Sequence, residues 1–465
     1  MEKIDQKAVF DSEGTRYELK KEVGAGGQGV VWETQLENIL VKCLKGSDAE
    51  KRELNYRRLT YLMLRSDLPH RVIAVPKTLL AEPDCGYVME LMDEMVPLEG
   101  SLRPPRNCRD VKQIIEWYRS SGAIRRRILL LHRLSGILVE IHSKGFCFGD
   151  LSPHNIFISE NPEHHEVQLI DCDNLVLLSE SDSRLYTPRY GAPELVRGES
   201  VHSTMTDAFS FAVIAYELLT LRHPLIGDMV SNGEPELEEA AFKGELSWVE
   251  DAKDTSNVSK DGLPSGLVVF KALRELFQKT FSDSQNIWTR PGLLEWQEAL
   301  ESVLHGFLKC DYCGLFFISN KDMNCPFCDQ RKDKNHLISL KFLRWDPEAG
   351  IGERLRSPKE IQLPRMILNK GETIEVPASL QYAGQGTVEI TMDESALYLL
   401  IKDTDKRRVV IRKKIGKDVD EGKASTLTLG KRQPIPREGA IREYCVHFDE
   451  LDVPHRVLSF KWGVA

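Results

Sequence analysis

The segment 145–158, Gly-Phe-Cys-Phe-Gly-Asp-Leu-Ser-Pro-His-Asn-Ile-Phe-Ile, constrains the fold of this chain more than any other. It follows an amphipathic helix predicted over 124–143 and leads into an apolar strand. Asp150 and Asn155 lie in the loop between them, and Asp171 follows at the end of the next apolar strand. One carboxylate that orients a hydroxyl, with an amide oxygen and a second carboxylate that bind metal, is the set of groups that phosphoryl transfer uses.

Length and composition bound the remaining possibilities. The 465 residues predict two or three domains, each able to form its own core. A formal charge of −9 disfavours a nucleic-acid-binding protein, which usually carries a basic excess. The start of the chain lacks the apolar region of a signal peptide, and the longest apolar run, near 209–219, is too short for a membrane span. With four clustered and six single cysteines, we expect a metal site, buried thiols and a cytoplasmic protein.

A glycine-rich hairpin near the start of the chain predicts a phosphate-binding loop. Gly24, Gly26, Gly29 and Val31 fit the pattern G-x-G-x-x-G-x-V, in which backbone amides can approach phosphate oxygens. An ordinary turn is the alternative. A dinucleotide-binding loop would open a helix at the third glycine, whereas here a strand continues and a second strand carries Lys42. The order of glycine hairpin and then lysine-bearing strand favours a cradle for nucleotide phosphates.

Lys42 needs an anionic partner that holds it against the phosphates. We select Glu53, on the helix predicted over the following residues, because its neighbours Leu54 and Tyr56 suggest that this face points inward. Glu50 lies almost one turn earlier, and a solvated helix carboxylate is the alternative interpretation of Glu53.

With these motifs the chain resembles a protein kinase. The segment 186–194, Tyr-Thr-Pro-Arg-Tyr-Gly-Ala-Pro-Glu, is similar to the end of a kinase activation segment. The resemblance implies that Thr187 contacts the catalytic loop and favours Ser/Thr substrates, and that Glu194 pairs with a buried Arg290. It also implies that Asp207 supports the backbone of the catalytic loop, although a simple helix N-cap is the plainer interpretation of that residue.

The resemblance further implies ATP with Mg²⁺ or Mn²⁺ as cofactors. Asp150 would orient the substrate hydroxyl, while Asn155 and Asp171 would bind the metal. Met89 would border the adenine pocket, with the segment from Glu90 to Met92 as its hinge. The predicted nucleotide-binding residues outside the glycine loop are Lys42, Glu53, Met89, Glu90 and Met92.

Three departures from the kinase pattern concern the catalytic residues. Phe148 and Gly149 replace the usual His-Arg before the catalytic aspartate, so the chain is of the non-RD type. Ser152 replaces the usual catalytic-loop lysine, with His154 as a candidate for compensation. The segment 171–173, Asp-Cys-Asp, replaces Asp-Phe-Gly. A pseudokinase scaffold that binds nucleotide or a partner without transfer is therefore the main alternative, ahead of a small-molecule phosphotransferase and a zinc-dependent adaptor.

Two cysteine pairs predict a zinc site. Cys310, Cys313, Cys325 and Cys328 form the pattern C-x2-C-x11-C-x2-C, which places four thiolates around one structural zinc ion. A redox role for one pair is the alternative, and nothing like a thioredoxin βαβ unit surrounds it. Three aromatic residues could form a docking face or the core of this small module: Phe316, Phe317 and Phe327.

We expect a multidomain α+β chain. A bilobal kinase-like domain would span 1–305, with lobes at about 17–92 and 93–305, followed by a zinc ribbon over 306–335 and a β-rich, sandwich-like interaction domain over 336–465. The strands predicted in that last domain are 361–368, 373–380, 387–392, 396–402, 407–412 and 457–462.

The catalytic-loop sequence, the Asp-Cys-Asp segment and the zinc ribbon together are similar to kinases of the tellurite-resistance-associated group. In that group a kinase, a phosphatase and a von Willebrand-type protein are encoded together. The resemblance implies a Ser/Thr protein kinase with a von Willebrand-type partner as substrate and a cognate phosphatase, and no nucleic-acid partner.

Overall fold

The computed structural model of the chain divides into two compact units, Met1–Leu300 and Glu301–Ala465, each described here by itself. The residues that it describes are 8–25, 29–45, 49–65, 67–178, 185–318, 323–347, 359–360, 366–376, 387–415, 418–439 and 443–463. Three predicted features lie wholly or partly outside them: Gly26, and positions 361–365 and 377–380 of two predicted strands. Among the described residues, none of the helices has the length and apolar character needed to cross a membrane.

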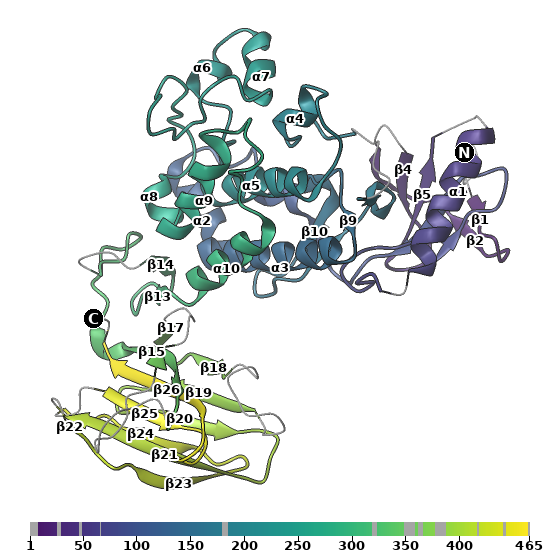
Figure 1. Ribbon diagram of the computed structural model, residues 1–465. Helices are drawn as coiled ribbons and strands as arrows, with labels where there is room; N and C mark the ends of the chain where they lie inside the picture. Colours follow the sequence, from purple (N-terminus) through teal and green to yellow (C-terminus); the bar gives the residue numbers. More distant parts are fainter. Residues whose placement is uncertain are drawn as a thin grey trace. The chain divides into compact units, whose positions relative to one another are not determined.

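The smaller lobe of the first unit is an antiparallel sheet with one helix beside it (Figure 1). In sheet order its strands are β3 (Glu22–Ala25), β4 (Gly29–Glu33), β5 (Ile39–Leu44), β7 (Gly86–Glu90) and β6 (Thr78–Leu79). A separate pair precedes them, β1 (Ala8–Phe10) and β2 (Arg16–Glu18). The chain thus continues as strand after the glycine hairpin, because β4 pairs with β5 along its whole length.

Helix α1 (Ala49–Leu64) lies beside this sheet, but not with the face that the sequence suggested. Leu59 and Leu62 are buried, whereas Leu54 and Tyr56 are 66% and 48% exposed. Because Leu59 and Leu62 are three positions apart, they define one helical face, and that face excludes Glu53.

The larger lobe of the first unit is mainly helical. Its helices are α2 (Val111–Ser120), α3 (Ala123–Ser143), α4 (Pro193–Val196), α5 (Thr204–Thr220), α6 (Asp228–Ser231), α7 (Pro235–Phe242), α8 (Ser265–Val268), α9 (Lys271–Phe281) and α10 (Leu293–Leu304). Its strands are β8 (Met95–Pro97), β10 (Ile156–Ser159) and β11 (Val167–Leu169) in one sheet, and β9 (Phe146–Cys147) with β12 (Val176–Leu177).

Helix α5 is the centre of this lobe. Every residue from Thr206 to Thr220 is buried, as expected of a helix that is apolar all round. Ser203 and Thr206 form a capping box in which the Ser203 side chain accepts from the Thr206 N–H and the Thr206 hydroxyl accepts from the Ser203 N–H. Ser203, rather than Asp207, is therefore the N-cap, and Asp207 lies inside the first turn.

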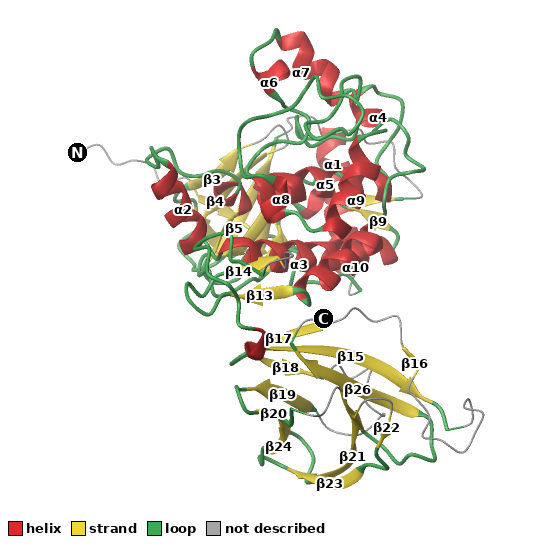
Figure 2. Ribbon diagram, turned by 90° about the vertical axis from the view of Figure 1, so that its left-hand side faces the viewer, coloured by secondary structure: helices red, strands yellow, loops and turns green. Residues whose placement is uncertain are grey.

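The described residues of the second unit form two larger antiparallel sheets besides a two-stranded hairpin, and Figure 2 shows the unit as mostly strand. The larger sheet holds β16 (Lys359–Glu360), β15 (Leu337–Trp345), β26 (His455–Trp462), β25 (Glu443–His447), β21 (Lys406–Ile415) and β22 (Asp418–Val419), with β17 (Met366–Asn369) and β23 (Lys423–Thr428) at branches. The smaller sheet holds β18 (Thr373–Glu375), β19 (Val388–Met392), β20 (Ala396–Ile401) and β24 (Gln433–Pro436). One buried apolar cluster draws side chains from both sheets, for example Leu340, Leu399 and Phe460, so the sheets share a core.

The predicted zinc ribbon belongs to this second unit. A short hairpin, β13 (Phe307–Lys309) and β14 (Phe316–Ile318), carries the first cysteine pair. Leu308 and Phe317 pack with Leu337 at the start of β15, and Ile367 of β17 lies against the same cluster. The ribbon is thus joined to the β-rich region through a common apolar cluster.

Candidate active site

The loop that carries Asp150 is held by a buried carboxylate on α5. Asp207, 1% exposed, accepts hydrogen bonds from the backbone N–H groups of Phe148 at 2.6 Å and Gly149 at 3.1 Å. Its Oδ2 also lies 2.9 Å from His142 Nε2 on α3. Because these groups fix the backbone directly before Asp150, helix α5 determines where that carboxylate lies.

Asp150 is in contact with both Asn155 and Thr187. Its Oδ1 accepts hydrogen bonds from the Thr187 backbone N–H and the Thr187 hydroxyl, both at 2.7 Å. The side-chain amide of Asn155, which is buried, donates to the backbone oxygen of Asp150 at 2.9 Å. The structure therefore brings the predicted catalytic loop and the predicted activation segment together at one carboxylate.

Asp171 offers an oxygen to a cation. It adopts a left-handed backbone conformation (φ +62°), which is uncommon for a residue other than glycine and typical of functional sites. Its Oδ2 lies 3.1 Å from Lys42 Nζ, while its Oδ1 is buried without a hydrogen-bond partner in the described part of the chain. Burial raises the pKa of the Asp171 carboxyl, an effect that Lys42 partly offsets and Asp173 reinforces. An unsatisfied buried carboxylate oxygen fits Mg²⁺ or Mn²⁺, which prefer such ligands.

Lys42 is almost fully buried between two carboxylates. Its Nζ donates to both oxygens of Asp173, at 2.8 and 3.0 Å, in addition to the contact with Asp171. The Tyr87 hydroxyl donates to Asp173 Oδ1 at 2.8 Å. Burial alone lowers the pKa of the Lys42 ammonium, but Asp173 and Asp171 outweigh it, so the pKa lies above its usual value.

The predicted pair of Lys42 with Glu53 is wrong. Glu53 is 60% exposed on the outer face of α1 and accepts a hydrogen bond at 2.8 Å from Arg57, four residues later. The apolar neighbours that suggested an inward face, Leu54 and Tyr56, are themselves exposed. Asp173, which stands where the kinase pattern has a glycine, takes this place as the partner of Lys42, and no sequence pattern had singled it out for that role.

The segment predicted as the hinge is hydrogen-bonded to Gln168, a residue that no sequence motif contains. Met89 is fully buried, and the exposed Glu90 side chain pairs with Lys77. Gln168 on β11 accepts a hydrogen bond from the Met92 N–H at 2.8 Å and donates to the Glu90 backbone oxygen at 3.2 Å. The Gln168 carboxamide thus bonds both the backbone oxygen of Glu90 and the backbone N–H of Met92.

The glycine hairpin approaches its neighbouring strand closely. Gly24 is paired with Val31 across β3 and β4, and Val31 is buried. A Cβ atom at Gly29 would lie 2.5 Å from the backbone oxygen of Cys43 on β5, so a side chain cannot replace this glycine without a shift. Gly26, the middle glycine of the motif, lies outside the described residues.

The end of the activation segment is anchored by a buried ion pair. Arg290 donates to both oxygens of Glu194, at 2.8 and 3.0 Å, and each residue is at most 5% exposed. Its guanidinium also donates to the backbone oxygens of Met205 and Ser284 and lies 5.0 Å from the centre of the Phe209 ring. The bidentate geometry and the extra acceptors satisfy charges that would otherwise be costly to bury.

Comparison with known proteins agrees with this arrangement. The family model for the protein kinase domain matches residues 17–263, which is more than half of the chain. The chain belongs to the protein kinase family. Its kinase domain is 34% identical over 116 residues to serine/threonine-protein kinase pkn2 of Myxococcus xanthus, covering 23% of this chain and 14% of that protein.

More distant relatives match over longer segments. Serine/threonine-protein kinase PknD of Chlamydia felis is 25% identical over 232 residues, covering 45% of this chain and 24% of the relative. A putative serine/threonine-protein kinase/receptor, R826, of Acanthamoeba polyphaga mimivirus is 26% identical over 216 residues, covering 45% and 12%. The chain therefore spans at most 24% of the length of these curated relatives.

The substituted catalytic-loop position, Ser152, carries no positive charge, and the nearby His154 is bound to a carboxylate. Ser152 is fully buried, and its hydroxyl has no hydrogen-bond partner among the described residues. The exposed His154 side chain pairs with Glu99, its Nδ1 lying 3.0 Å from Glu99 Oε2. His154 is thus engaged with a carboxylate in this structure.

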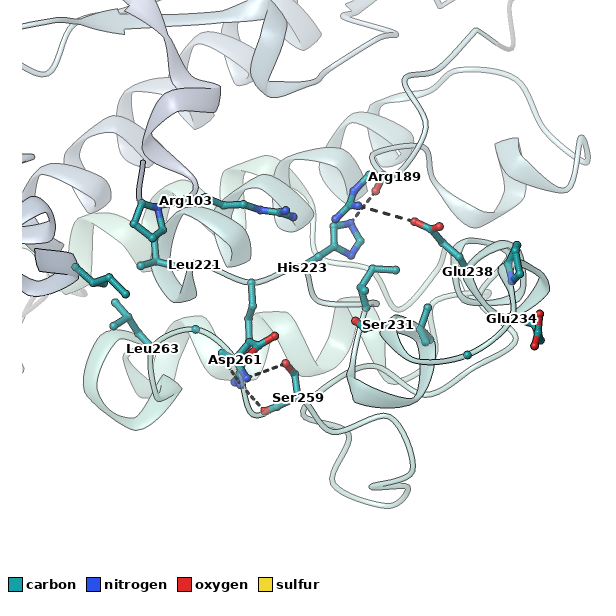
Figure 3. Close-up of a pocket in the computed structure, with 18 residues that line it drawn as sticks. Arg103, Arg189, Leu221, His223, Ser231, Glu234, Glu238, Ser259, Asp261 and Leu263 are labelled. Carbon is teal, nitrogen blue, oxygen red and sulfur yellow. Dashed lines mark hydrogen bonds and ion pairs between the residues drawn. The ribbon is translucent and has the colours of Figure 1, made fainter. Parts of the chain in front are cut away.

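A groove in the larger lobe lies next to the activation segment (Figure 3). It has a volume of about 860 Å³ and is lined by residues of both charges, including Arg189 and Glu238. His223 Nε2 lies 3.0 Å from the Arg189 backbone oxygen, and its Nδ1 accepts from the Leu225 N–H. Burial lowers the pKa of His223 to about 4, so this imidazole is neutral at pH 7. Arg189 follows Thr187 by two residues, so the segment that contacts Asp150 also contributes to the lining of this groove.

The four clustered cysteines of the second unit have the geometry of a tetrahedral metal site. Their sulfurs all lie within 4.8 Å of one another, with 3.6 Å between Cys310 and Cys328 and between Cys313 and Cys325. Tetrahedral zinc with Zn–S bonds of about 2.3 Å places its sulfurs about 3.8 Å apart. A disulfide would bring two of them to about 2.05 Å. The cluster can therefore bind zinc with all four positions filled by protein.

The aromatic residues beside this cluster differ in exposure. Phe317 is buried in the small core, and Phe316 packs edge-on against Phe307 with their ring centres 6.0 Å apart. Phe327 is 37% exposed. Core packing thus accounts for Phe317, whereas Phe327 lies partly in solvent.

Proposed function

We propose that the first unit transfers the γ-phosphoryl group of ATP to a Ser or Thr hydroxyl of a protein. The observation that carries the proposal is the cluster of Asp150, Asn155 and Thr187 beside Asp171, whose free buried oxygen suits a divalent cation. Asp150 would accept the proton of the attacking hydroxyl or orient it, and Thr187 fixes the carboxylate for that task.

ATP and Mg²⁺ fit the donors of this site. Asp171 and Asn155 would hold the metal, and Lys42 with the hairpin around Gly24 and Gly29 would hold the phosphates. The bound cation supplies positive charge that offsets the charge developing on the transferred group. With Ser152 in place of a lysine, Lys42 and the metal would provide that charge alone, which predicts a low turnover.

A scaffold that binds nucleotide without transfer is the second candidate. The buried Ser152 and the Gln168 carboxamide on the hinge favour it, because the first removes a cation and the second already occupies two backbone groups that a base could use. The contacts of Asp150 with Thr187 and Asn155 favour transfer.

The test is transfer of labelled phosphate from Mg-ATP to the protein itself and to a generic substrate. Wild type is compared with Asp150→Asn and with Glu53→Gln, which removes one carboxylate from the outer face of α1. We expect a loss of about 10²–10⁴-fold for Asp150→Asn and wild-type rates for Glu53→Gln. Nucleotide binding without transfer in wild type would instead establish the scaffold.

We further propose a von Willebrand-type protein as substrate, a cognate phosphatase, a cytoplasmic location and a structural zinc ion at the four cysteines. The first three rest on motif resemblance and composition, and the fourth on the sulfur geometry. Phosphate transfer to a purified von Willebrand-type domain, at a rate above that of a generic substrate, tests the partner directly.

A further inference from the structure

Lys42 is buried against the segment that carries the metal-binding aspartate, and not against helix α1. We propose that Asp173 is a positioning residue that holds Lys42 toward the ATP phosphates. It replaces the carboxylate on α1 that was predicted to pair with this lysine. The inference rests on the proposed function and adds a residue to it.

The contacts among three buried side chains carry this inference. Lys42, Tyr87 and Asp173 are 2%, 0% and 8% exposed. Lys42 and Tyr87 are directly paired on the adjacent strands β5 and β7, so both point to the same carboxylate from one sheet. Asp173 accepts from Lys42 with both oxygens and from the Tyr87 hydroxyl with Oδ1. A carboxylate with three donated hydrogen bonds at 2.8–3.0 Å has a fixed orientation.

The backbone keeps Asp173 and Asp171 in one rigid turn. The 3₁₀ turn η3 (Cys172–Asn174) follows Asp171, and the Asn174 N–H donates to the Asp171 backbone oxygen at 2.9 Å. The Leu175 N–H then donates to the Cys172 oxygen at 2.9 Å. The partner of the lysine and the metal-binding carboxylate therefore move together.

Helix α1 cannot supply an equivalent group in this arrangement. Its two carboxylates, Glu50 and Glu53, are both exposed. The helix instead reaches the turn through Arg58, whose guanidinium donates to the Leu175 backbone oxygen at 2.8 Å. Helix α1 is thus linked to the turn through the uncharged backbone oxygen of Leu175. The negative charge that faces Lys42 comes from Asp173 in the turn.

Charge balance explains why two carboxylates suit this position. Lys42 neutralises one of them, and the other leaves a net negative charge for a divalent cation. Asp173 makes the bidentate contact with Lys42, while Asp171 keeps an unpaired oxygen. We therefore assign Asp173 to the lysine and Asp171 to the metal. In kinases where the lysine pairs with a helix carboxylate, helix position controls the pair. In this protein a shift of α1 would leave the pair of Lys42 and Asp173 intact.

The first experiment measures nucleotide affinity in the Asp150→Asn background, where no transfer intervenes. A fluorescent ATP analogue is titrated into that protein and into versions that also carry Asp173→Asn, Tyr87→Phe or Glu53→Gln. Loss of a charge-assisted contact predicts that Asp173→Asn weakens binding about 10-fold to 100-fold. Tyr87→Phe should weaken binding less, and Glu53→Gln should leave it unchanged. A loss with Glu53→Gln as large as with Asp173→Asn would overturn the assignment.

The second experiment detects the contact without nucleotide. Thermal unfolding of wild type, Lys42→Met, Asp173→Asn and the double variant forms a double-mutant cycle. Each single change leaves a buried charge without its partner, so the double variant should lose less than the sum of the two. Strictly additive losses would mean that the two side chains do not act as a pair.

The dependence of transfer on Mg²⁺ distinguishes a positioning role of Asp173 from a role as a metal ligand. If Asp173 is itself a metal ligand, Asp173→Asn raises the Mg²⁺ concentration needed for half-maximal transfer and leaves the affinity for metal-free nucleotide unchanged, which overturns the positioning role. If the assignment holds, the KM for ATP rises and the Mg²⁺ requirement stays within twofold. Should wild type transfer no phosphate, the binding titration and the unfolding cycle still decide the role of Asp173, and only the proposed function fails.

Discussion

The functional clusters of the two units differ in how far apart their residues lie in the sequence. In the second unit, Cys310 and Cys328 delimit a cluster whose members are close in sequence. In the first unit, Lys42 meets Asp173, and Glu194 meets Arg290, across long stretches of chain and several elements. Spacing therefore predicts the first kind of cluster, whereas the packing of whole elements decides the second kind.

Removal of metal gives the largest expected difference between the two units. Cys325→Ser, or chelation followed by return of Mg²⁺, should release the zinc ion proposed at the four cysteines and unfold the ribbon, because zinc binding to such sites contributes about 10–16 kcal/mol. Hydrogen exchange should rise in β13 and β14, while phosphate transfer by the first unit continues. Leu308 and Leu337 share a cluster, so some increase should reach the start of β15. Loss of transfer in Cys325→Ser, or after chelation once Mg²⁺ is restored, would contradict the independence of the two sites.

Breaking the buried anchor should destabilise the first unit only. Glu194→Gln leaves Arg290 charged and buried, and removing one partner of such a pair costs about 3–5 kcal/mol. Hydrogen exchange in α5 should therefore increase, with the strands of the second unit unchanged. Glu199→Gln is the matched control, because the Glu199 carboxylate lies in solvent and its pair with the partly exposed Arg197 contributes about 0–1 kcal/mol. Equal losses for both variants would show that burial is not the cause.

Acid should weaken both units through separate histidines. The pKa of His223 is lowered to about 4, so between about pH 6.5 and 4 the unfolded chain binds a proton that the folded first unit does not. The neutral His223 therefore stabilises the first unit fully above this pH range. The free energy of unfolding falls by roughly 3 kcal/mol as the pH decreases through the range. In the second unit, burial lowers the pKa of His447 to about 3.

Urea unfolding followed by hydrogen exchange reports each unit separately. His223→Gln should flatten the acid dependence of the first unit and leave that of the second, where His447 still titrates. A change in the second unit alone would contradict this assignment of the two histidines.

The smallest expected effect concerns the hydroxyl of Thr187. Thr187→Val removes one of two hydrogen bonds to Asp150 Oδ1 and keeps the backbone one, which predicts a fall in kcat of about 10-fold. Thr187→Ser should retain the rate. If Thr187→Val matches wild type while Thr187→Ser does not, the contact with Asp150 is not what orients that carboxylate.

The sequence predicted correctly those features whose residues lie close together along the chain. The family, the pair of Asp150 with Asn155, the cysteine cluster and the antiparallel strands around 387–392, 396–402, 407–412 and 457–462 all followed from local patterns. These strands alternate apolar and polar residues or run continuously apolar, and their bounds need no knowledge of their partners.

Elements that depend on distant partners were missed or misassigned. Glu53 was chosen from its neighbours, but the inward face of α1 is set by Leu59 and Leu62, which the sequence alone did not rank. Asp173 carried a signal in the second carboxylate of Asp-Cys-Asp. Gln168 had no local signal. In the β-rich unit, β24 contains Pro434 and Pro436, which weaken a strand pattern although the strand pairs with β20.

The pairing of β15 with β26 has a consequence for how the second unit folds. Ser339 pairs with Lys461, so the central ladder of the larger sheet joins two strands from opposite ends of the unit. Chains dominated by such distant contacts fold slowly, because loop closure must precede the contacts that stabilise it. During synthesis, the edge of β15 that pairs with β26 would stay open until β26 has emerged, and this interval is when the unit is most prone to aggregation.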